Sequence, residues 1–349
     1  MRILHAIFSF HVGGAETMLV DILNHQVEKH EVALVVVNNL YSNCLLSKID
    51  CRVKVFLVGR PAASKNMWYF FKLNKYALWF QPQILHCHDA NICKYILPIN
   101  TMKKVYTVHG PNLPLSGIEC YDSVVAISDG VKLDVLDRTA IVSEKLYNGI
   151  DVRKISPRES PFASNGSFRI IQIGRLLDEI KGQSLVIRAL SLLKQKDLGV
   201  EVSIDFIGAG SSESALKEMV AQLGLLDHVR FLGLKDREYI YSHLKEYDLL
   251  VQPSLFEGFG LTVVEAMVAG LPVLVSDVEG PMEIIKKGKY GFYFESNNVD
   301  DLVRKLVSLI KSPEKRLWMA GLGQQYAMDN FDIAVTVKNY ENLYKGLLG

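Results

Sequence analysis

Short apolar runs alternate along the chain with longer segments in which apolar residues recur every three or four positions. The short runs predict buried strands, and the longer period predicts helices. The run at 2–8 leads into a turn with Gly13 and Gly14, a helix from 15 to about 28, and a second apolar run at 31–37. This order predicts an α/β protein with a parallel, doubly wound sheet whose ligands bind at the carboxyl ends of the strands.

The alternation stops near residue 150 and begins again at 168. Residues 151–167 lose the periodicity and gather prolines, serines and a glycine, which indicates a linker. With 349 residues the chain is too long for one ordinary core. We therefore predict an N-terminal domain over 1–150 and a C-terminal domain over 168–330. Strands of the second domain are expected near 168–174, 200–207, 229–232, 248–252, 272–276 and 291–294.

Composition narrows the class of protein. A net charge of +1 and 49% hydrophobic residues describe a soluble globular protein and argue against a nucleic-acid partner, which needs a strong basic excess. The five cysteines form no short regular framework, which favours reduced thiols and the cytosol. No run of eighteen apolar residues occurs, so we expect no membrane span. Because residues 1–10 lead straight into a polar glycine turn, we interpret them as the first strand and expect no signal peptide.

Residues 251–275 carry the strongest functional signal. They predict a strand, a turn with Gly258 and Gly260, a helix over 261–269 and a second strand. The first N–H groups of such a helix lack partners and attract anions, so a phosphate can bind there. Glu257 in the turn and Glu265 in the helix can then accept hydrogen bonds from hydroxyls, and phosphate beside a polyol suggests a nucleotide sugar. The alternative is that Glu257 only caps the helix and Glu265 is solvated.

The Glu-x7-Glu spacing, the glycines and the apolar flanks together resemble the signature of retaining glycosyltransferases of family 4. The resemblance implies the GT-B fold, in which two Rossmann-like, doubly wound domains face each other across a cleft. It further implies that Glu257 contacts the donor sugar, Glu265 the ribose hydroxyls, and the backbone of Phe259, Gly260, Leu261 and Thr262 the donor phosphate and sugar. The last helix, about 331–349, would return to the N-terminal domain.

Two cations follow the strand predicted at 168–173. Arg175 offers a planar fork for phosphate oxygens and Lys181 a compact charge, and both resemble the family's cation pair that neutralises the leaving diphosphate. No Asp-x-Asp pair occurs in the chain to hold a divalent ion. We therefore expect no metal and no cofactor, the nucleotide sugar being the donor substrate. Gly208 lies in a loop that resembles the family's loop near the nucleotide. The alternative is that Arg175 and Lys181 are only solvated charges in a loop.

The first glycine turn also resembles a family loop. Gly13 and Gly14, with Glu16 two residues on, correspond to the loop that faces the donor phosphates and the acceptor. The alternative is a plain strand-to-helix turn. A dinucleotide fingerprint would need a third glycine where Thr17 stands, so binding of a nicotinamide cofactor is not expected.

Histidines stand at two further strand ends. His109 resembles the family's histidine that contacts a donor-sugar hydroxyl, and His88 with Asp89 is expected to face the acceptor. A metal site is the alternative for the group at 86–89, but alternation places Cys87 on the other side of the strand from His86 and His88, and no Cys-x2-Cys partner exists. A structural histidine is the alternative for His109.

Residues 67–80 combine seven aromatic side chains with two lysines. This pattern suits a helix that lies on an anionic membrane, and it equally suits an ordinary helix that covers the sheet. Because the family often glycosylates lipid-linked acceptors, both interpretations stay open. The N-terminal domain is predicted to be the acceptor side.

The resulting hypothesis is transfer of a hexose from a UDP- or GDP-sugar to a hydroxyl of a glycan or lipid-linked acceptor, with retention, in surface polysaccharide biosynthesis. Domain closure would bring His109, Gly13 and Gly14 onto the donor. The alternatives are a sugar-nucleotide 2-epimerase and a non-catalytic partner subunit. One departure from the family is Glu279 before Gly280, where two adjacent glycines are usual, and this leaves the local turn open.

Overall fold

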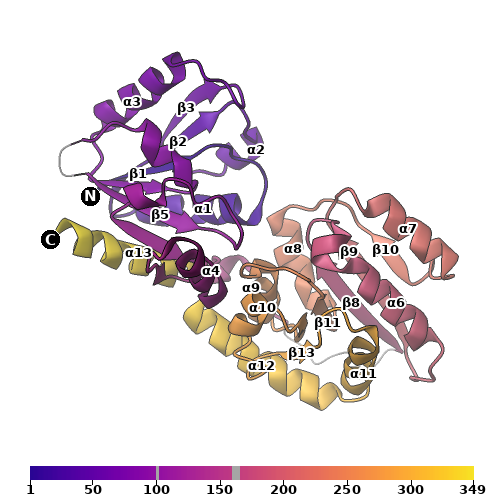
Figure 1. Cartoon of the computed structure of the whole chain (residues 1–349). Helices are drawn as coiled ribbons and strands as arrows, with labels where there is room; N and C mark the ends of the chain where they lie inside the picture. The colour runs from indigo at the N-terminus through magenta and orange to yellow at the C-terminus, as the bar shows by residue number, and fades with distance from the viewer. Residues whose placement is uncertain (100–101, 159–165) are drawn as a thin grey trace. The chain divides into compact units, whose positions relative to one another are not determined.

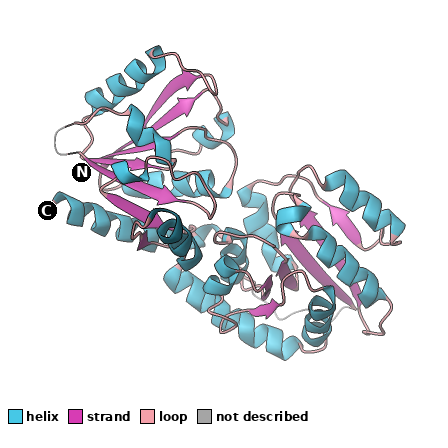
Figure 2. Ribbon diagram, in the orientation of Figure 1, coloured by secondary structure: helices cyan, strands magenta, loops and turns pink. Residues whose placement is uncertain are grey.

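A computed structural model describes residues 1–99, 102–158 and 166–349 of the chain (Figure 1). It divides into two units, unit 1 being Met1–Ile150 with Phe331–Gly349 and unit 2 being Asp151–Asn330. Each unit is a parallel sheet flanked by helices (Figures 1 and 2). The predicted α/β class with two doubly wound sheets is confirmed. Residues 159–165 of the predicted linker lie outside the described residues.

Unit 1 contains a seven-stranded sheet in the order β3-β2-β1-β4-β5-β6-β7. Its central strands are buried along almost their whole length, as the apolar runs predict. The edge strands β3 and β7 were not predicted, since β7 pairs through two residues and β3 is only partly buried. The strands are β1 (Arg2–Ile7), β2 (Glu31–Asn38), β3 (Lys54–Arg60), β4 (Ile84–Cys87), β5 (Lys103–Val108), β6 (Ser123–Ala126) and β7 (Glu144–Lys145).

Helices from both ends of the chain cover this sheet. The C-terminal helix α13 brings Val337, Tyr340 and Tyr344 into a core that also contains Ile3 and Ile84. Residues 331–349 are therefore an integral layer of unit 1. The helices of unit 1 are α1 (Gly14–Gln26), α2 (Asn43–Leu46), α3 (Trp68–Phe80), α4 (Asp129–Thr139) and α13 (Ile333–Leu348), with short 3-10 turns η1 (Ala90–Tyr95) and η2 (Ile118–Cys120).

Unit 2 contains a six-stranded sheet in the order β10-β9-β8-β11-β12-β13. All six of its strands lie within two residues of the predicted ranges, because each is a short and mainly apolar segment between polar turns. The strands are β8 (Ser167–Ile173), β9 (Glu201–Ile207), β10 (Val229–Phe231), β11 (Leu249–Gln252), β12 (Val273–Ser276) and β13 (Phe292–Phe294).

The helices of unit 2 pack an apolar face on this sheet. Leu185, Leu190 and Leu306 lie in one buried cluster with strand residues such as Ile204 and Val251. The helices are α5 (Asp178–Lys181), α6 (Gln183–Lys194), α7 (Glu213–Gln222), α8 (Arg237–His243), α9 (Leu261–Val268), α10 (Glu279–Ile284), α11 (Val299–Ile310) and α12 (Pro313–Asn330), with 3-10 turns η3 (Val152–Lys154) and η4 (Leu244–Glu246).

Candidate functional site

The carboxylate of Glu257 is the centre of a polar cluster at the carboxyl ends of β8 and β11. Lys181 Nζ donates to Glu257 Oε2 at 2.5 Å, and the two side chains are 21% and 15% exposed. Gln252 Nε2 and Ser254 Oγ donate to the same oxygen at 3.0 and 3.2 Å. Three donors therefore hold one carboxylate oxygen of Glu257 in place.

The backbone and two buried amides position this cluster. Lys181 is the last residue of α5, and its carbonyl accepts a hydrogen bond from Gln172 Nε2 at 3.0 Å. Gln252 ends β11 and accepts from Thr262 Oγ1, at the start of α9, at 3.4 Å. Gln172 and Gln252 are each 2% exposed, so the strands fix both amides. The predicted site residues Lys181, Glu257 and Thr262 are thus brought together.

The tip of α9 lies directly after the Glu257 loop. The N-cap residue Gly260 has φ +111°, a conformation that favours glycine, and its carbonyl accepts from Val263 N at 3.0 Å. Within the described part of the chain, the N–H groups of Gly260, Leu261 and Thr262 donate to no acceptor. Since such N–H groups carry the positive end of the helix dipole, this turn can receive an anion.

Glu265 is held on the inner side of α9. Glu265 is 6% exposed, and its Oε1 accepts a hydrogen bond from Tyr241 Oη at 3.3 Å. Arg237 Nε lies 3.7 Å from the same oxygen. The alternative that Glu265 is a solvated helix residue is therefore wrong. A buried carboxylate beside a tyrosine and an arginine is suited to hydrogen bonding with a polar ligand.

Arg175 and Gly208 come from the neighbouring loops. Arg175 follows β8 and is exposed, and its carbonyl accepts from Gln183 Nε2 at 3.0 Å. A Cβ at Gly208 would lie 1.9 Å from the carbonyl oxygen of Gly174. Gly208 therefore has a packing role, because it lets the loop after β9 touch the loop after β8.

The segment in which the chain departs from the family pattern also supports the Glu257 loop. Glu279 and Gly280 begin α10, so this segment is a helix start. A Cβ at Gly280 would lie 2.7 Å from Glu257 O and 2.8 Å from Phe259 N. Gly280 thus allows α10 to press against the backbone that carries Glu257. Phe259 is 3% exposed, so its side chain is part of the core beside this loop.

In unit 1, the predicted glycine loop is the start of α1. Gly13 is the N-cap and Gly14 the first helical residue. Thr17 Oγ1 donates to the carbonyls of both glycines, at 2.7 and 3.1 Å. A Cβ at Gly13 would lie 2.5 Å from Glu16 Oε2, so the Glu16 carboxylate is folded over the loop.

His88 and His109 are linked at the ends of β4 and β5. His88 Nδ1 lies 2.9 Å from His109 Nε2, and His88 Nε2 lies 3.1 Å from His5 Nδ1. Burial lowers the pKa of His109 to about 4 and holds the pKa of His88 well below its usual range. Both ring nitrogens of His88 are therefore engaged with other histidines.

Asp89 has a structural partner as well. Its Oδ2 accepts from Phe8 N at 2.8 Å, which ties the end of β1 to the loop after β4. Burial raises the pKa of Asp89, and the Phe8 N–H partly opposes this. The carboxylate can still accept a second hydrogen bond, so contact with an acceptor substrate stays a prediction.

Three buried histidines offer a geometry that a metal could use. Nitrogens of His5, His86 and His88 lie within 4.8 Å of one another. Each ring nitrogen already has a hydrogen-bond partner: Gln26 for His5, Tyr344 and Thr107 for His86, and neighbouring histidines for the rest. A metal ion would have to displace these bonds, and the cluster does not include Cys87.

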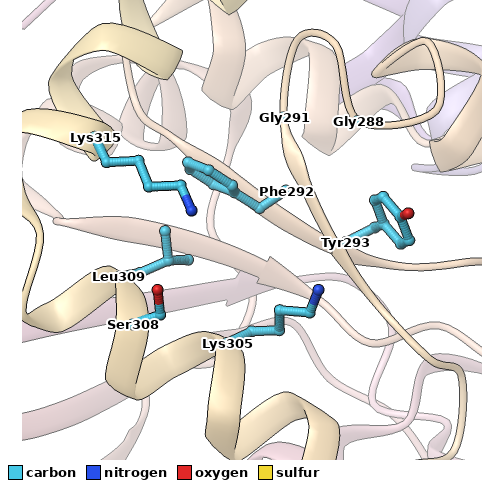
Figure 3. Close-up of a pocket in the computed structure, with 8 residues that line it drawn as sticks. All are labelled: Gly288, Gly291, Phe292, Tyr293, Lys305, Ser308, Leu309 and Lys315. Carbon is cyan, nitrogen blue, oxygen red and sulfur yellow. The ribbon is translucent and has the colours of Figure 1, made fainter.

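A hollow of about 120 Å³ lies elsewhere in unit 2 (Figure 3). Lys305 from α11 and Lys315 from α12 reach toward the strand that carries Phe292 and Tyr293 (Figure 3). Lys305 Nζ lies 5.3 Å from the centre of the Tyr293 ring, and Lys315 Nζ lies 5.5 Å from the centre of the Phe292 ring. The hollow is at the start of β13, the opposite edge of the sheet from Glu257, so it is not the ligand edge of a parallel sheet.

Sequence reasoning missed three residues that build the site. Gln172, Gln252 and Ser254 position Lys181 and Glu257, and none was singled out. Gln252 and Ser254 stand at the polar end of an apolar strand, which is the signal that could have found them. Gln172 lies inside a strand, where a buried amide is unusual enough to be noted.

Comparison with known proteins agrees with this architecture. A family model described as Glycosyltransferase Family 4 matches residues 12–154, and one described as Glycosyl transferases group 1 matches residues 155–324. The two models together span residues 12–324, and the chain is a glycosyltransferase of the group that they describe.

Two individual relatives are similar over about three quarters of the chain. An uncharacterized glycosyltransferase of Methanocaldococcus jannaschii is 26% identical over 299 residues, which is 75% of each chain. The N-acetyl-alpha-D-glucosaminyl L-malate synthase of Bacillus anthracis is 26% identical over 290 residues, 76% of this chain and 75% of the relative.

Solved structures show the fold. A glycosyltransferase from Rickettsia africae superposes with a TM-score of 0.81 at 19% identity, covering 99% of this chain and 98% of that one. Anabaena HepE, solved in complex with UDP and glucose, gives 0.82 at 21% identity and covers 99% of both chains. The predicted GT-B fold is confirmed.

Proposed function

We propose that this glycosyltransferase moves a hexose from a UDP- or GDP-sugar to a hydroxyl of a glycan or lipid-linked acceptor, with retention at the anomeric carbon. The observation that carries the proposal is the Lys181–Glu257 pair beside the unpartnered N–H groups of Gly260, Leu261 and Thr262. A cation and a helix tip suit a diphosphate, and a fixed carboxylate suits a sugar hydroxyl.

In this proposal the diphosphate leaves toward Lys181, Arg175 and the first turn of α9. These groups stabilise the charge that develops on the phosphate oxygens, and they do so without a divalent ion. Glu257 accepts a hydrogen bond from the donor sugar and Glu265 from the ribose. Gly208 and the Phe259 backbone line the donor site. No cofactor is invoked, because the donor itself brings the leaving group.

Unit 1 supplies the remaining groups of the proposal. His109 receives a hydroxyl of the donor sugar, and Gly13 and Gly14 offer backbone to the donor. Glu16 and Asp89 are assigned to the acceptor. His88, whose nitrogens both bond other histidines, acts through His109. We assign the reaction to surface polysaccharide biosynthesis as part of this proposal. The five free thiols support a cytoplasmic location.

Binding of nucleotide sugars tests the donor site. A panel of UDP- and GDP-sugars would be titrated calorimetrically, and Lys181→Ala is expected to weaken the best donor about 10- to 100-fold, the value of a hydrogen bond to a charged group. Lys217→Ala is the matched control, since Lys217 also pairs with a glutamate, Glu213, but on the exposed face of α7. Equal affinity in wild type, Lys181→Ala and Arg175→Ala would reject the assignment.

Product analysis separates the proposal from its alternatives. A 2-epimerase would convert the nucleotide sugar without any acceptor, and a non-catalytic subunit would bind without turnover. NMR of the anomeric proton of the product decides between retention and inversion. An inverted product would contradict the retaining mechanism while leaving the donor site intact.

We further propose that α3 rests on an anionic membrane. Leu73, Ala77 and Phe80 pack inward, whereas Trp68, Phe71 and Trp79 are 67%, 68% and 65% exposed. Lys75 lies on the same exposed face. Ordinary packing and an exposed aromatic face thus occur on opposite sides of one helix, and the latter suits a membrane interface. Among the described helices, none has the length and apolar content to cross a bilayer.

Sedimentation with lipid vesicles tests this contact. Wild type is expected to pellet with vesicles containing phosphatidylglycerol and much less with phosphatidylcholine alone. Trp68→Ser with Phe71→Ser should abolish pelleting. Trp318→Ser is the control, because Trp318 is 63% exposed but lies on α12 of unit 2. Equal pelleting by the double variant and wild type would refute the membrane role of α3.

A further inference from the structure

Four side chains in unit 1 form one line of hydrogen bonds. Gln26 Oε1 lies 2.8 Å from His5 Nε2, His5 Nδ1 lies 3.1 Å from His88 Nε2, and His88 Nδ1 lies 2.9 Å from His109 Nε2. Gln26 is the last residue of α1, and the histidines stand on or directly after the adjacent strands β1, β4 and β5. The line therefore connects a helix end to the ligand edge of the sheet.

Each ring in this line is neutral near pH 7. Burial lowers the pKa of His5 to about 4, although the Gln26 amide partly opposes this, and it lowers the pKa of His109 to about 4. A neutral imidazole has one N–H donor and one acceptor nitrogen. In a line of rings that are hydrogen-bonded nitrogen to nitrogen, every ring must therefore donate toward the same end of the line, either toward Gln26 or toward His109.

The amide of Gln26 decides that direction. Because Gln26 presents its carbonyl oxygen to His5 Nε2, the proton of His5 must be on Nε2 and its Nδ1 must accept. The same requirement then places the protons of His88 and His109 on Nε2 as well. His109 Nδ1 is left as an acceptor, and it is buried with no hydrogen-bond partner among the described residues.

We propose that Gln26, His5 and His88 are positioning residues that hold His109 in the tautomer with Nε2 protonated, so that Nδ1 accepts a hydrogen bond from a substrate hydroxyl. The tautomer follows from the hydrogen-bond line and from the neutral state of its rings, whereas the role of the hydroxyl rests on the proposed function. A sugar hydroxyl is a donor of the kind that an unpartnered buried acceptor lacks.

The tautomers can be read directly by NMR. Protein labelled with ¹⁵N-histidine would be studied at pH 7 by long-range ¹H–¹⁵N correlation, which distinguishes protonated from bare ring nitrogens. The His109 signals would be assigned from the spectrum of His109→Gln. His5, His88 and His109 are expected to carry the proton on Nε2. A proton on His109 Nδ1 would overturn the proposal, with or without any knowledge of the substrate.

Two variants separate positioning from general structural support. Gln26→Met removes the amide from the line, and His109 is then expected to show both tautomers. Thr107→Val is the control, because Thr107 is equally buried but bonds His86 and Tyr340, outside the line, so His109 should be unchanged. A single unchanged His109 tautomer in folded Gln26→Met would refute the positioning role.

The last measurement concerns the substrate. Addition of a donor found in the binding panel is expected to shift the His109 Nδ1 signal, and Gln26→Met should lower kcat/KM about fivefold, as for one neutral hydrogen bond. If the tautomers are as expected but no nucleotide sugar binds, the proposed function fails and the positioning survives. If Gln26→Met does not fold, the wild-type tautomers alone decide.

Discussion

The ring of His86 and the hydroxyl of Tyr344 are hydrogen-bonded across most of the chain, with Nδ1 and Oη 2.6 Å apart. His86 lies on β4 and Tyr344 on α13, and both residues are fully buried. The other nitrogen of His86 bonds Thr107 on β5 at 2.7 Å. This contact joins the last helix to the centre of the first sheet.

Tyr344→Phe is therefore expected to lower the free energy of unfolding of unit 1 by about 1–3 kcal/mol, because His86 Nδ1 would be buried without a partner. Urea unfolding followed by fluorescence measures this. Tyr293→Phe is the control, since Tyr293 is 41% exposed, and it should change stability by less than about 0.5 kcal/mol. Equal effects of the two variants would contradict the prediction.

The buried histidines make unit 1 sensitive to acid. Burial lowers the pKa of His5 and of His109 to about 4, below the value of about 6.5 in the unfolded chain. The stability that these two histidines contribute is fully present above a pH of about 6.5. As the pH falls from there toward 4, the unfolded state binds the proton first, so the contribution of each histidine to the free energy of unfolding decreases by about 1.4 kcal/mol per pH unit.

A tryptophan variant isolates this pH effect. Trp68 and Trp79 lie in unit 1 and Trp318 in unit 2, so Trp318→Phe leaves a fluorescence signal from unit 1 only. Urea midpoints would be measured between pH 7.5 and 4.5, roughly spanning the range in which histidine titrates. A midpoint that stays constant down to pH 5 would show that these histidines are not held neutral.

The Lys181–Glu257 pair is expected to be energetically coupled. Lys181→Met should cost about 1–3 kcal/mol of unit 2 stability, because it leaves a largely buried carboxylate without its cation. Lys181→Met with Glu257→Gln should cost less than the sum of the two single variants. Lys217→Met, which breaks an exposed pair on α7, should cost at most about 0.5 kcal/mol. Additive single costs would indicate that the pair is not coupled.

Gly208 tests the contact between two site loops. Gly208→Ala places a methyl group 1.9 Å from Gly174 O and is expected to destabilise unit 2 by roughly 2–4 kcal/mol through forced backbone movement. Gly321→Ala has open space around it on helix α12 and should stabilise by up to about 1 kcal/mol. Thermal unfolding of both variants gives the comparison, and a neutral Gly208→Ala would contradict the close packing.

The fold was predictable because its strands are locally encoded. The run at 32–37 is apolar over its full length, and the run at 202–207 is mainly apolar, with Ser203 and Asp205 as its polar members. In the structure both are largely buried strands. Edge strand β3 escaped prediction since only part of it is buried. The family was recognisable because Glu257 and Glu265 lie in one continuous segment.

The partners of the site residues were less visible. Lys181 and Glu257 are 76 residues apart, and they meet because β8 and β11 are neighbours in the sheet, an order that the linear pattern does not show. Gln26 ends a helix and His5 lies within a strand, so nothing in the spacing connects either to His109. The burial of Glu265, likewise, depends on Tyr241 from another helix.

Unit 1 is built from both ends of the chain, with α13 supplying Tyr340 and Tyr344 to its interior. During synthesis on the ribosome, residues 1–150 therefore emerge before α13 is made. The face of their sheet that α13 covers stays uncovered until the whole of unit 2 has been synthesised. A polypeptide stopped short of residue 331 would retain all of unit 2, with every residue of that unit that we propose for donor binding. It would nevertheless leave Ile3 and Ile84 without the α13 residues that cover them, and we expect such exposed apolar surface to promote aggregation.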